Sequence, residues 1–228
     1  MPEVSEELQR YANSLERMNI QFEGKGGNEL GDKDFESLLS HGVLIPDAYA
    51  LSFNNMGILL VGGSEARASI GKKFIEMNGN KASVLAAKNP TLYVPNGAAR
   101  PVAFLNDNRL WEQPWLEPFL EPEYSDKFKF LTVSYIFQLV QDNGIEVRPG
   151  NPQSAIDTMV FGGQRWAKTE ESNSRLLRML AEVKCYTVLN NSAYYSSSSV
   201  GQGASSRIAT QADHNLERIV ERLEVQIR

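Results

Sequence analysis

The segment Ala66–Lys73, ARASIGKK, contains the residue types of a phosphate-binding loop and follows the apolar run 57–63. Such a loop needs a buried strand, a glycine-rich turn and a helix that begins with Gly-Lys-Ser/Thr, so that backbone N–H groups and the lysine contact the phosphates and the hydroxyl contacts magnesium. Gly71 and Lys72 fit this pattern, but Lys73 stands where the hydroxyl is required. The motif is therefore incomplete.

A strand, a Gly-Gly turn and an ordinary helix explain the same stretch better. The sequence EARAS at 65–69 is typical of a helix rather than of a glycine-rich turn. We predict a buried strand within 57–63, followed by a helix that Ser64 caps and Gly79 ends.

A second glycine-containing segment, VGQGASSR at 200–207, precedes a predicted helix and offers Ser205 and Ser206 to an anion. The flanking serines suit a solvated hinge equally well. An alternative function follows from these two stretches: a small nucleotide- or phosphate-dependent enzyme that uses 57–73 or 200–207.

The histidines and the cysteine do not form a recognisable catalytic or metal-binding pattern. Asp213, His214 and Glu217 lie close together in the sequence, but a catalytic zinc typically has three protein ligands and the other histidine, His41, is remote. We predict no metal site and an exposed His214. Cys185 falls inside a predicted helix beside an apolar stripe, where a free cysteine usually acts as a small buried hydrophobe.

Basic residues beside an aromatic residue offer a possible surface for single-stranded nucleic acid. Such surfaces combine phosphate contacts with base stacking. The alternative is a solvated helix face with a buried tryptophan. The candidate residues for nucleic-acid binding are Arg165, Trp166, Lys168, Arg175, Arg178 and Arg207.

Composition limits the function classes. The chain has 228 residues, a net charge of −5 and one cysteine. This charge excludes a strongly basic nucleic-acid-binding domain, and the single cysteine fits a reducing, cytoplasmic compartment. No apolar run approaches the roughly 20 residues of a membrane-spanning helix, and the acidic start of the sequence predicts no secretory signal.

Amphipathic helices are predicted at both ends of the chain. The first, 1–22, is followed by a glycine-rich joint at 23–31; the second, 207–228, follows a Ser- and Gly-rich loop at 191–206. Each has an apolar stripe suited to packing on another helix or another subunit. The stripe residues predicted to mediate oligomerisation are Val4, Leu8, Tyr11, Leu15 and Met18 in the first helix and Leu216, Ile219 and Leu223 in the second.

Between these helices, residues 32–190 are predicted to form a mostly helical core with a few short strands. Its clearest helices are predicted at 125–142, where Phe128, Leu131, Tyr135 and Leu139 form a stripe, and at 170–189. The fold class is therefore α+β, predominantly α-helical, with two amphipathic terminal helices.

These features together predict a non-enzymatic, self-assembling structural protein without a cofactor, a coat or nucleocapsid-type subunit that binds single-stranded nucleic acid. A helix with a narrow apolar stripe must bury it, and docking on the next subunit builds rings or filaments, hence a homo-oligomer. In plan, the chain resembles the subunits of helical viral nucleoproteins. A further alternative is an adaptor domain whose terminal helices bind partner proteins.

Overall fold

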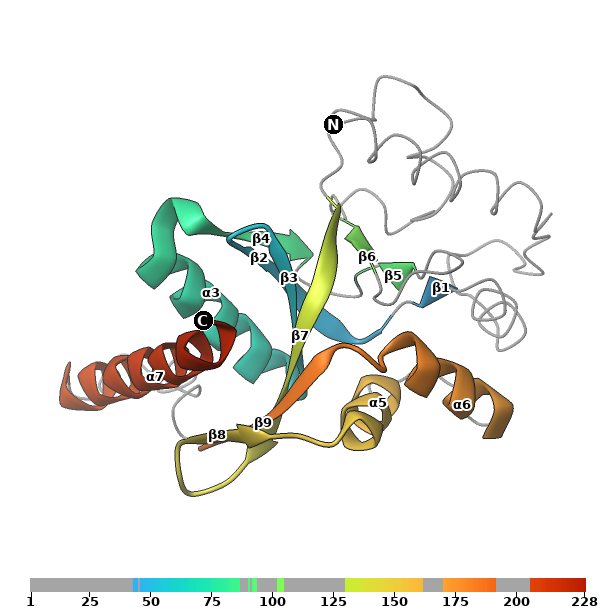
Figure 1. Cartoon of the computed structure of the whole chain (residues 1–228). Helices are drawn as coiled ribbons and strands as arrows, with labels where there is room; N and C mark the ends of the chain where they lie inside the picture. Colours follow the sequence, from blue (N-terminus) through green and yellow to red (C-terminus); the bar gives the residue numbers. More distant parts are fainter. Residues whose placement is uncertain are drawn as a thin grey trace, which may run out of the picture.

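A mixed β-sheet lies at the centre of the chain, with helices on both of its faces (Figure 1). The computed structural model describes residues 43–44, 46–86, 90, 92–93, 102–104, 130–161, 170–191 and 206–228. This three-layer arrangement buries both faces of the sheet, so its central strands carry apolar residues on both sides rather than alternating strictly between apolar and polar residues.

Six strands form the body of the sheet, in the order β4–β2–β3–β7–β9–β8. Strands β3, β7 and β9 are parallel neighbours, and β2, β4 and β8 pair antiparallel to theirs. The strands are β2 (Ala48–Phe53), β3 (Met56–Val61), β4 (Ala82–Ala86), β7 (Phe130–Gln141), β8 (Glu146–Pro149) and β9 (Lys184–Asn190).

Three short strands extend the sheet from the beginning of β7. They are β1 (Val43–Leu44), β5 (Leu92–Tyr93) and β6 (Val102–Phe104), and all three pair antiparallel. β7 therefore pairs with β6 at its start and with β3 and β9 over the rest of its length.

A two-residue turn joins β2 to β3. Asn54 and Asn55 both have positive φ, 48° and 62°. Hairpin turns in which both central residues have positive φ match the twist of the flanking strands, and asparagine tolerates this conformation. The turn fixes the register in which Phe53 lies opposite Met56.

Helices α3 (Ser64–Asn78) and α7 (Ser206–Ile227) cover one face of the sheet, and α5 (Pro152–Phe161) and α6 (Glu170–Met179) cover the other (Figure 1). Successive residues of β7 pack on opposite faces of the sheet. Phe137 belongs to the core under α3 and α7, and Ile136 belongs to the core under α5 and α6. A 3-10 turn, Gly79–Lys81, leads from α3 into β4.

The prediction of a mostly helical core with a few short strands is wrong, because the core is a sheet. Where a helix is predicted at 125–142, the structure has the strand β7, Phe130–Gln141. Where a helix is predicted at 170–189, the helix α6 ends at Met179 and the strand β9 follows from Lys184. In β7, aromatic and branched residues cover both sides of the strand, and such a run satisfies helical spacing by chance.

The strand and helix predicted around the Gly-Gly turn are confirmed. β3 lies within 57–63 apart from its first residue, and α3 begins at Ser64 and ends before Gly79, which has the positive φ (50°) favoured at helix ends. The capping detail differs, since Gly63 occupies the N-cap and makes no side-chain capping bond. Among the described helices, none is long and apolar enough to cross a membrane.

Candidate functional site

The turn 142–145 crosses over the end of one strand. β7 leads into β8, but β9 lies between these two strands in the sheet, so the connection must pass the carboxyl end of β9. The Asp142 N–H donates to the carbonyl of Asn190 at 2.6 Å. On the far side of the turn, the Arg222 guanidinium donates to the carbonyl of Ile145 at 2.6 Å and ties the turn to α7.

A depression of about 500 Å³ lies beside this crossover turn, at the carboxyl ends of β7 and β9. Within the described part of the chain, its lining consists of Gln141, Asp142, Asn143 and Asn191. The three amides both donate and accept hydrogen bonds, and the carboxylate only accepts. In open α/β sheets, ligands bind outside the carboxyl ends of parallel strands, so this is the part of the sheet where a ligand site is expected.

β3 is parallel to β7 and ends at the same edge of the sheet, where Gly62 and Gly63 lead into α3. The ARASIGKK segment lies entirely within α3, so none of its residues forms a phosphate-binding turn. Gly71 is a helical residue against the ring of Tyr49, and a Cβ there would lie 2.6 Å from a ring carbon. The glycine therefore serves close packing.

Arg67, in the first turns of α3, is a buried charge that the sequence analysis missed. Its Nη2 donates to Asp47 Oδ1 at 2.7 Å, and the side chain is 5% exposed. Asp47 directly precedes β2, so this ion pair joins the start of α3 to the start of β2. Among the described residues, Arg67 Nη1 has no hydrogen-bond partner.

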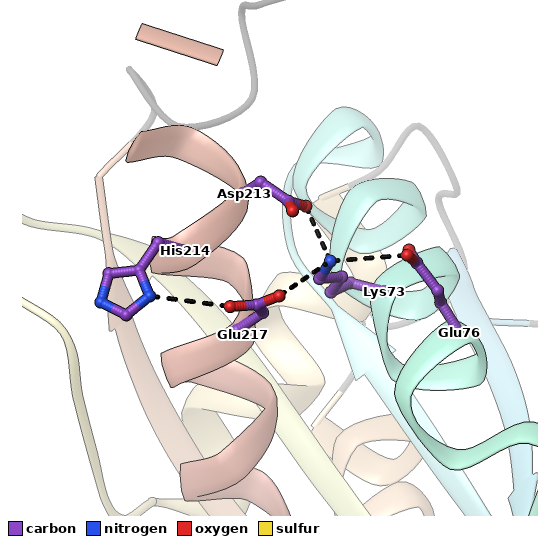
Figure 2. Close-up of polar contacts among 5 residues, drawn as sticks. All are labelled: Lys73, Glu76, Asp213, His214 and Glu217. Carbon is purple, nitrogen blue, oxygen red and sulfur yellow. Dashed lines mark ion pairs between the residues drawn. The ribbon is translucent and has the colours of Figure 1, made fainter. Parts of the chain in front are cut away.

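A second cluster of charges, the Lys73 cluster, joins α3 to α7 (Figure 2). The Lys73 ammonium lies 2.8 Å from Asp213, 3.3 Å from Glu217 and 3.6 Å from Glu76, and its side chain is 6% exposed. The His214 ring lies at the outer side of Glu217, with Nδ1 at 3.6 Å, and is 67% exposed. Asp213 and Glu217 remain partly exposed. The aliphatic part of the Lys73 side chain is therefore buried between the helices, and its ammonium group lies near the surface beside these carboxylates.

The Lys73 cluster keeps the ammonium charged. The hydrogen bond from Lys73 to Asp213 is the largest effect on the pKa of Lys73 and raises it; burial lowers the pKa, and Glu217 and Glu76 raise it further, with a net increase. A nucleophilic or proton-accepting lysine needs the opposite shift. In the described part of the chain, no group of histidine, cysteine and carboxylate residues could hold a metal ion, so we interpret the cluster as a clamp between α3 and α7.

This clamp predicts a pH dependence of stability. Folding raises the pKa of Lys73 above 10.5, its ordinary value. The charged ammonium therefore stabilises the folded state fully below pH 10.5, and this stabilisation is lost as the pH rises through the higher pKa of the folded state. We expect Lys73→Met to lower the melting temperature near neutral pH, and this difference from the wild type to shrink in strongly alkaline buffer. Lys72→Met, at the exposed neighbouring position, is the control and should match the wild type throughout. A Lys73→Met difference that persists unchanged at high pH would contradict the charge-based clamp.

Cys185 lies in β9, not in a helix as predicted. Burial raises the pKa of its thiol to about 11. Because the thiolate is the reactive form, this shift disfavours a nucleophilic role for Cys185.

Leu216, Ile219 and Leu223, predicted as oligomerisation residues, lie on the face of α7 that packs on this chain's own sheet. Ile219 and Leu223 are buried in the core shared with α3, and Leu216 packs against that core. Their apolar face is therefore covered within the chain. The other predicted stripe, Val4, Leu8, Tyr11, Leu15 and Met18, lies outside the described residues.

The residues predicted to bind nucleic acid are only partly described. Arg178 is exposed on α6, and its Nε donates to the carbonyl of Ser174 at 3.3 Å. Arg175 lies in α6 and Arg207 in α7, on different layers of the fold. The described residues do not include Arg165, Trp166 and Lys168 or most of the 200–207 segment, which reaches α7 at Ser206. Nucleic-acid binding by these residues stays a prediction.

Comparisons with known proteins assign no family. No protein-family model matches the chain, and no curated protein sequence matches it. Among solved structures, the HPr(Ser) kinase/phosphatase from Coxiella burnetii matches with a TM-score of 0.33 and 8% sequence identity, over 81% of this chain and 98% of that chain. A likeness of this extent assigns no activity, so the proposal below rests on the geometry of the chain alone.

Proposed function

We propose that the chain binds a small polar ligand in the depression at the carboxyl ends of β7 and β9. The supporting observation is the coincidence of this depression, about 500 Å³ in volume, with the end of the sheet where parallel strands present their terminal residues. A volume of this size is within the range of small-molecule sites, roughly 300–1,000 Å³.

The lining selects the chemistry of the ligand. Amide groups of Gln141, Asn143 and Asn191 pair with hydroxyl, amine and carbonyl groups, and Asp142 adds a negative charge. Among the described lining residues there is no cation to pair with a phosphate. The proposed ligand is therefore neutral or cationic and rich in hydroxyl or amine groups, unlike the phosphate ligand that ARASIGKK suggests.

The test is binding by saturation-transfer NMR with a panel of monosaccharides, free amino acids and polyamines, alongside inorganic phosphate. We expect a signal from at least one neutral or cationic compound and its loss in Asn191→Leu, which replaces a lining amide by an apolar group of similar size. Lys72→Ala is the matched control, since Lys72 is exposed on α3 and is needed only if the phosphate-loop alternative holds.

The outcomes separate the alternatives. Binding of phosphate that Lys72→Ala abolishes would favour the phosphate-dependent enzyme and contradict the proposal. A panel without any binding, or binding that Asn191→Leu leaves unchanged, would also contradict it. Circular dichroism of Asn191→Leu must match the wild type, so that loss of signal reports the site and not the fold.

A separate proposal, self-assembly through the N-terminal helix 1–22 with nucleic-acid binding, rests on the sequence pattern. Its support is the stripe predicted in that helix; α7 has its apolar face covered within the chain. Light scattering of the protein with and without residues 1–30 tests it. An unchanged particle mass after this deletion would contradict assembly through the N-terminal helix.

A further inference from the structure

Two Asn–Gly pairs lie in the described part of the chain, Asn78–Gly79 and Asn143–Gly144. Because glycine has no Cβ, its backbone nitrogen can approach the side chain of the preceding residue closely. In an Asn–Gly pair this brings a backbone nitrogen within reach of the side-chain carbonyl carbon, Cγ. The two pairs have the same sequence but different surroundings, so the structure distinguishes their chemistry.

The pair Asn78–Gly79 is held at the end of α3. Asn78 Nδ2 donates to the carbonyl of Phe74 at 2.9 Å and to Glu224 Oε1 at 2.8 Å. The Gly79 N–H, which would have to attack, donates to the carbonyl of Ile75. Both reacting groups are therefore occupied, and α7 holds one of them through Glu224.

The pair Asn143–Gly144 lies in the crossover turn 142–145, and both residues are exposed. Among the described residues, no hydrogen bond holds the Asn143 side chain in the way that Phe74 and Glu224 hold the Asn78 side chain. The Gly144 N–H donates instead to Asp142 Oδ1 at 3.2 Å, so a carboxylate contacts the proton that the attacking nitrogen must lose. The turn thus leaves the amide free to rotate and places a proton acceptor beside the nucleophile.

We propose that Asn143 is a site of spontaneous deamidation that the turn itself promotes. The Gly144 nitrogen passes its proton to the Asp142 carboxylate and bonds to Cγ of Asn143. The Cγ–Nδ2 bond then breaks, and the amide nitrogen leaves as ammonia with that proton, which gives a five-membered succinimide. One water molecule opens the ring at either carbonyl and yields aspartate or isoaspartate, with no change of oxidation state.

The modification changes the candidate site directly. Asp142 is the one carboxylate among the described lining residues, and deamidation places a second one beside it. In the isoaspartate product, the backbone of the turn is also longer by one methylene. The chemistry depends on the turn alone, so it holds whether or not the depression binds a ligand.

The experiment follows both Asn–Gly pairs in one sample. Full-length protein is incubated at neutral pH and physiological temperature, digested at intervals, and the peptides that contain Asn143 and Asn78 are quantified by mass spectrometry, with isoaspartyl methyltransferase labelling to identify isoaspartate. We expect deamidation at Asn143 several-fold faster than at Asn78 in the folded chain. In urea the difference should narrow, because the hydrogen bonds that restrain Asn78 and Gly79 are then lost.

Two variants test the assigned roles. Gly144→Ala should slow deamidation of Asn143 strongly, since a Cβ hinders the attack, and Asp142→Asn should slow it several-fold by removing the proton acceptor. Equal rates at Asn143 and Asn78 in the folded protein would overturn the proposal. An unchanged rate in Asp142→Asn, with a fold that matches the wild type by circular dichroism, would overturn the role of the carboxylate.

Discussion

Ile219→Ala is expected to lower the free energy of unfolding by about 2–5 kcal/mol, the usual cost of truncating a fully buried isoleucine. Ile219 is 0% exposed and belongs to the core that α7 shares with Ile70 and Phe74 of α3 and Phe137 of β7. The Tyr135 hydroxyl also donates to the carbonyl of Ile227 at 3.3 Å and fixes the end of α7 on the sheet. The truncation therefore opens a cavity inside one chain.

The measurement is urea unfolding followed by circular dichroism, with light scattering on the same sample. The particle mass should not change, because Ile219 contacts its own chain. Val225→Ala is the matched control: Val225 is on the same helix but is 66% exposed, so this change should shift the midpoint little. A lower particle mass with unchanged stability would contradict this expectation and support the prediction that α7 packs on a neighbouring subunit.

The helix α7 shows what apolar spacing can and cannot predict. The recurrence of Leu216, Ile219 and Leu223 predicts both the helix and its buried face, and both are observed. The same spacing does not say what covers that face. Its partners, Phe74 and Phe137, are distant in sequence, so local periodicity could not distinguish packing within the chain from packing on another subunit.

In strand β7, apolar spacing predicts the wrong type of element. Tyr135 and Leu139 are four residues apart and suggest a helical stripe, but they lie on the same side of a strand as Phe137. Two residues between them lie on the other side, which α5 and α6 cover: Ile136 is apolar, and Gln138 is buried and donates hydrogen bonds to Ser154 and Thr158 of α5. A strand buried on both faces has no alternation, so period alone could not separate it from a helix.

The candidate site could not be predicted from the sequence for a related reason. Asp142, Asn143 and Gly144 form a clear turn signal after an apolar run, but helical spacing alone interprets this segment only as the end of the predicted helix 125–142. That the turn crosses β9, and so meets Asn191, depends on the strand order β7–β9–β8, which no local pattern contains.

Gly62→Ala is expected to lower the free energy of unfolding by about 2–5 kcal/mol, from backbone strain and a steric clash together. Gly62 has φ of 127°, a region that other residues rarely adopt. A Cβ there would lie 2.6 Å from the carbonyl oxygen of Leu139 in β7. The clash cannot relax without moving β7 away from the end of β3, and the backbone strain remains even then, so the urea midpoint should fall clearly.

The adjacent Gly63 provides the control. Its φ is −55°, and a Cβ there would have no atom within 4 Å. Gly63→Ala should therefore change stability by less than about 1 kcal/mol, because the smaller entropy of the unfolded state is offset by the lower preference of alanine for the N-cap position that Gly63 occupies. If the two glycines also contacted a phosphate, both substitutions would in addition weaken phosphate binding. A large loss of stability in Gly62→Ala alone, without an effect on phosphate binding, would mean that Gly62 is required because β3 and β7 approach closely where the chain turns into α3.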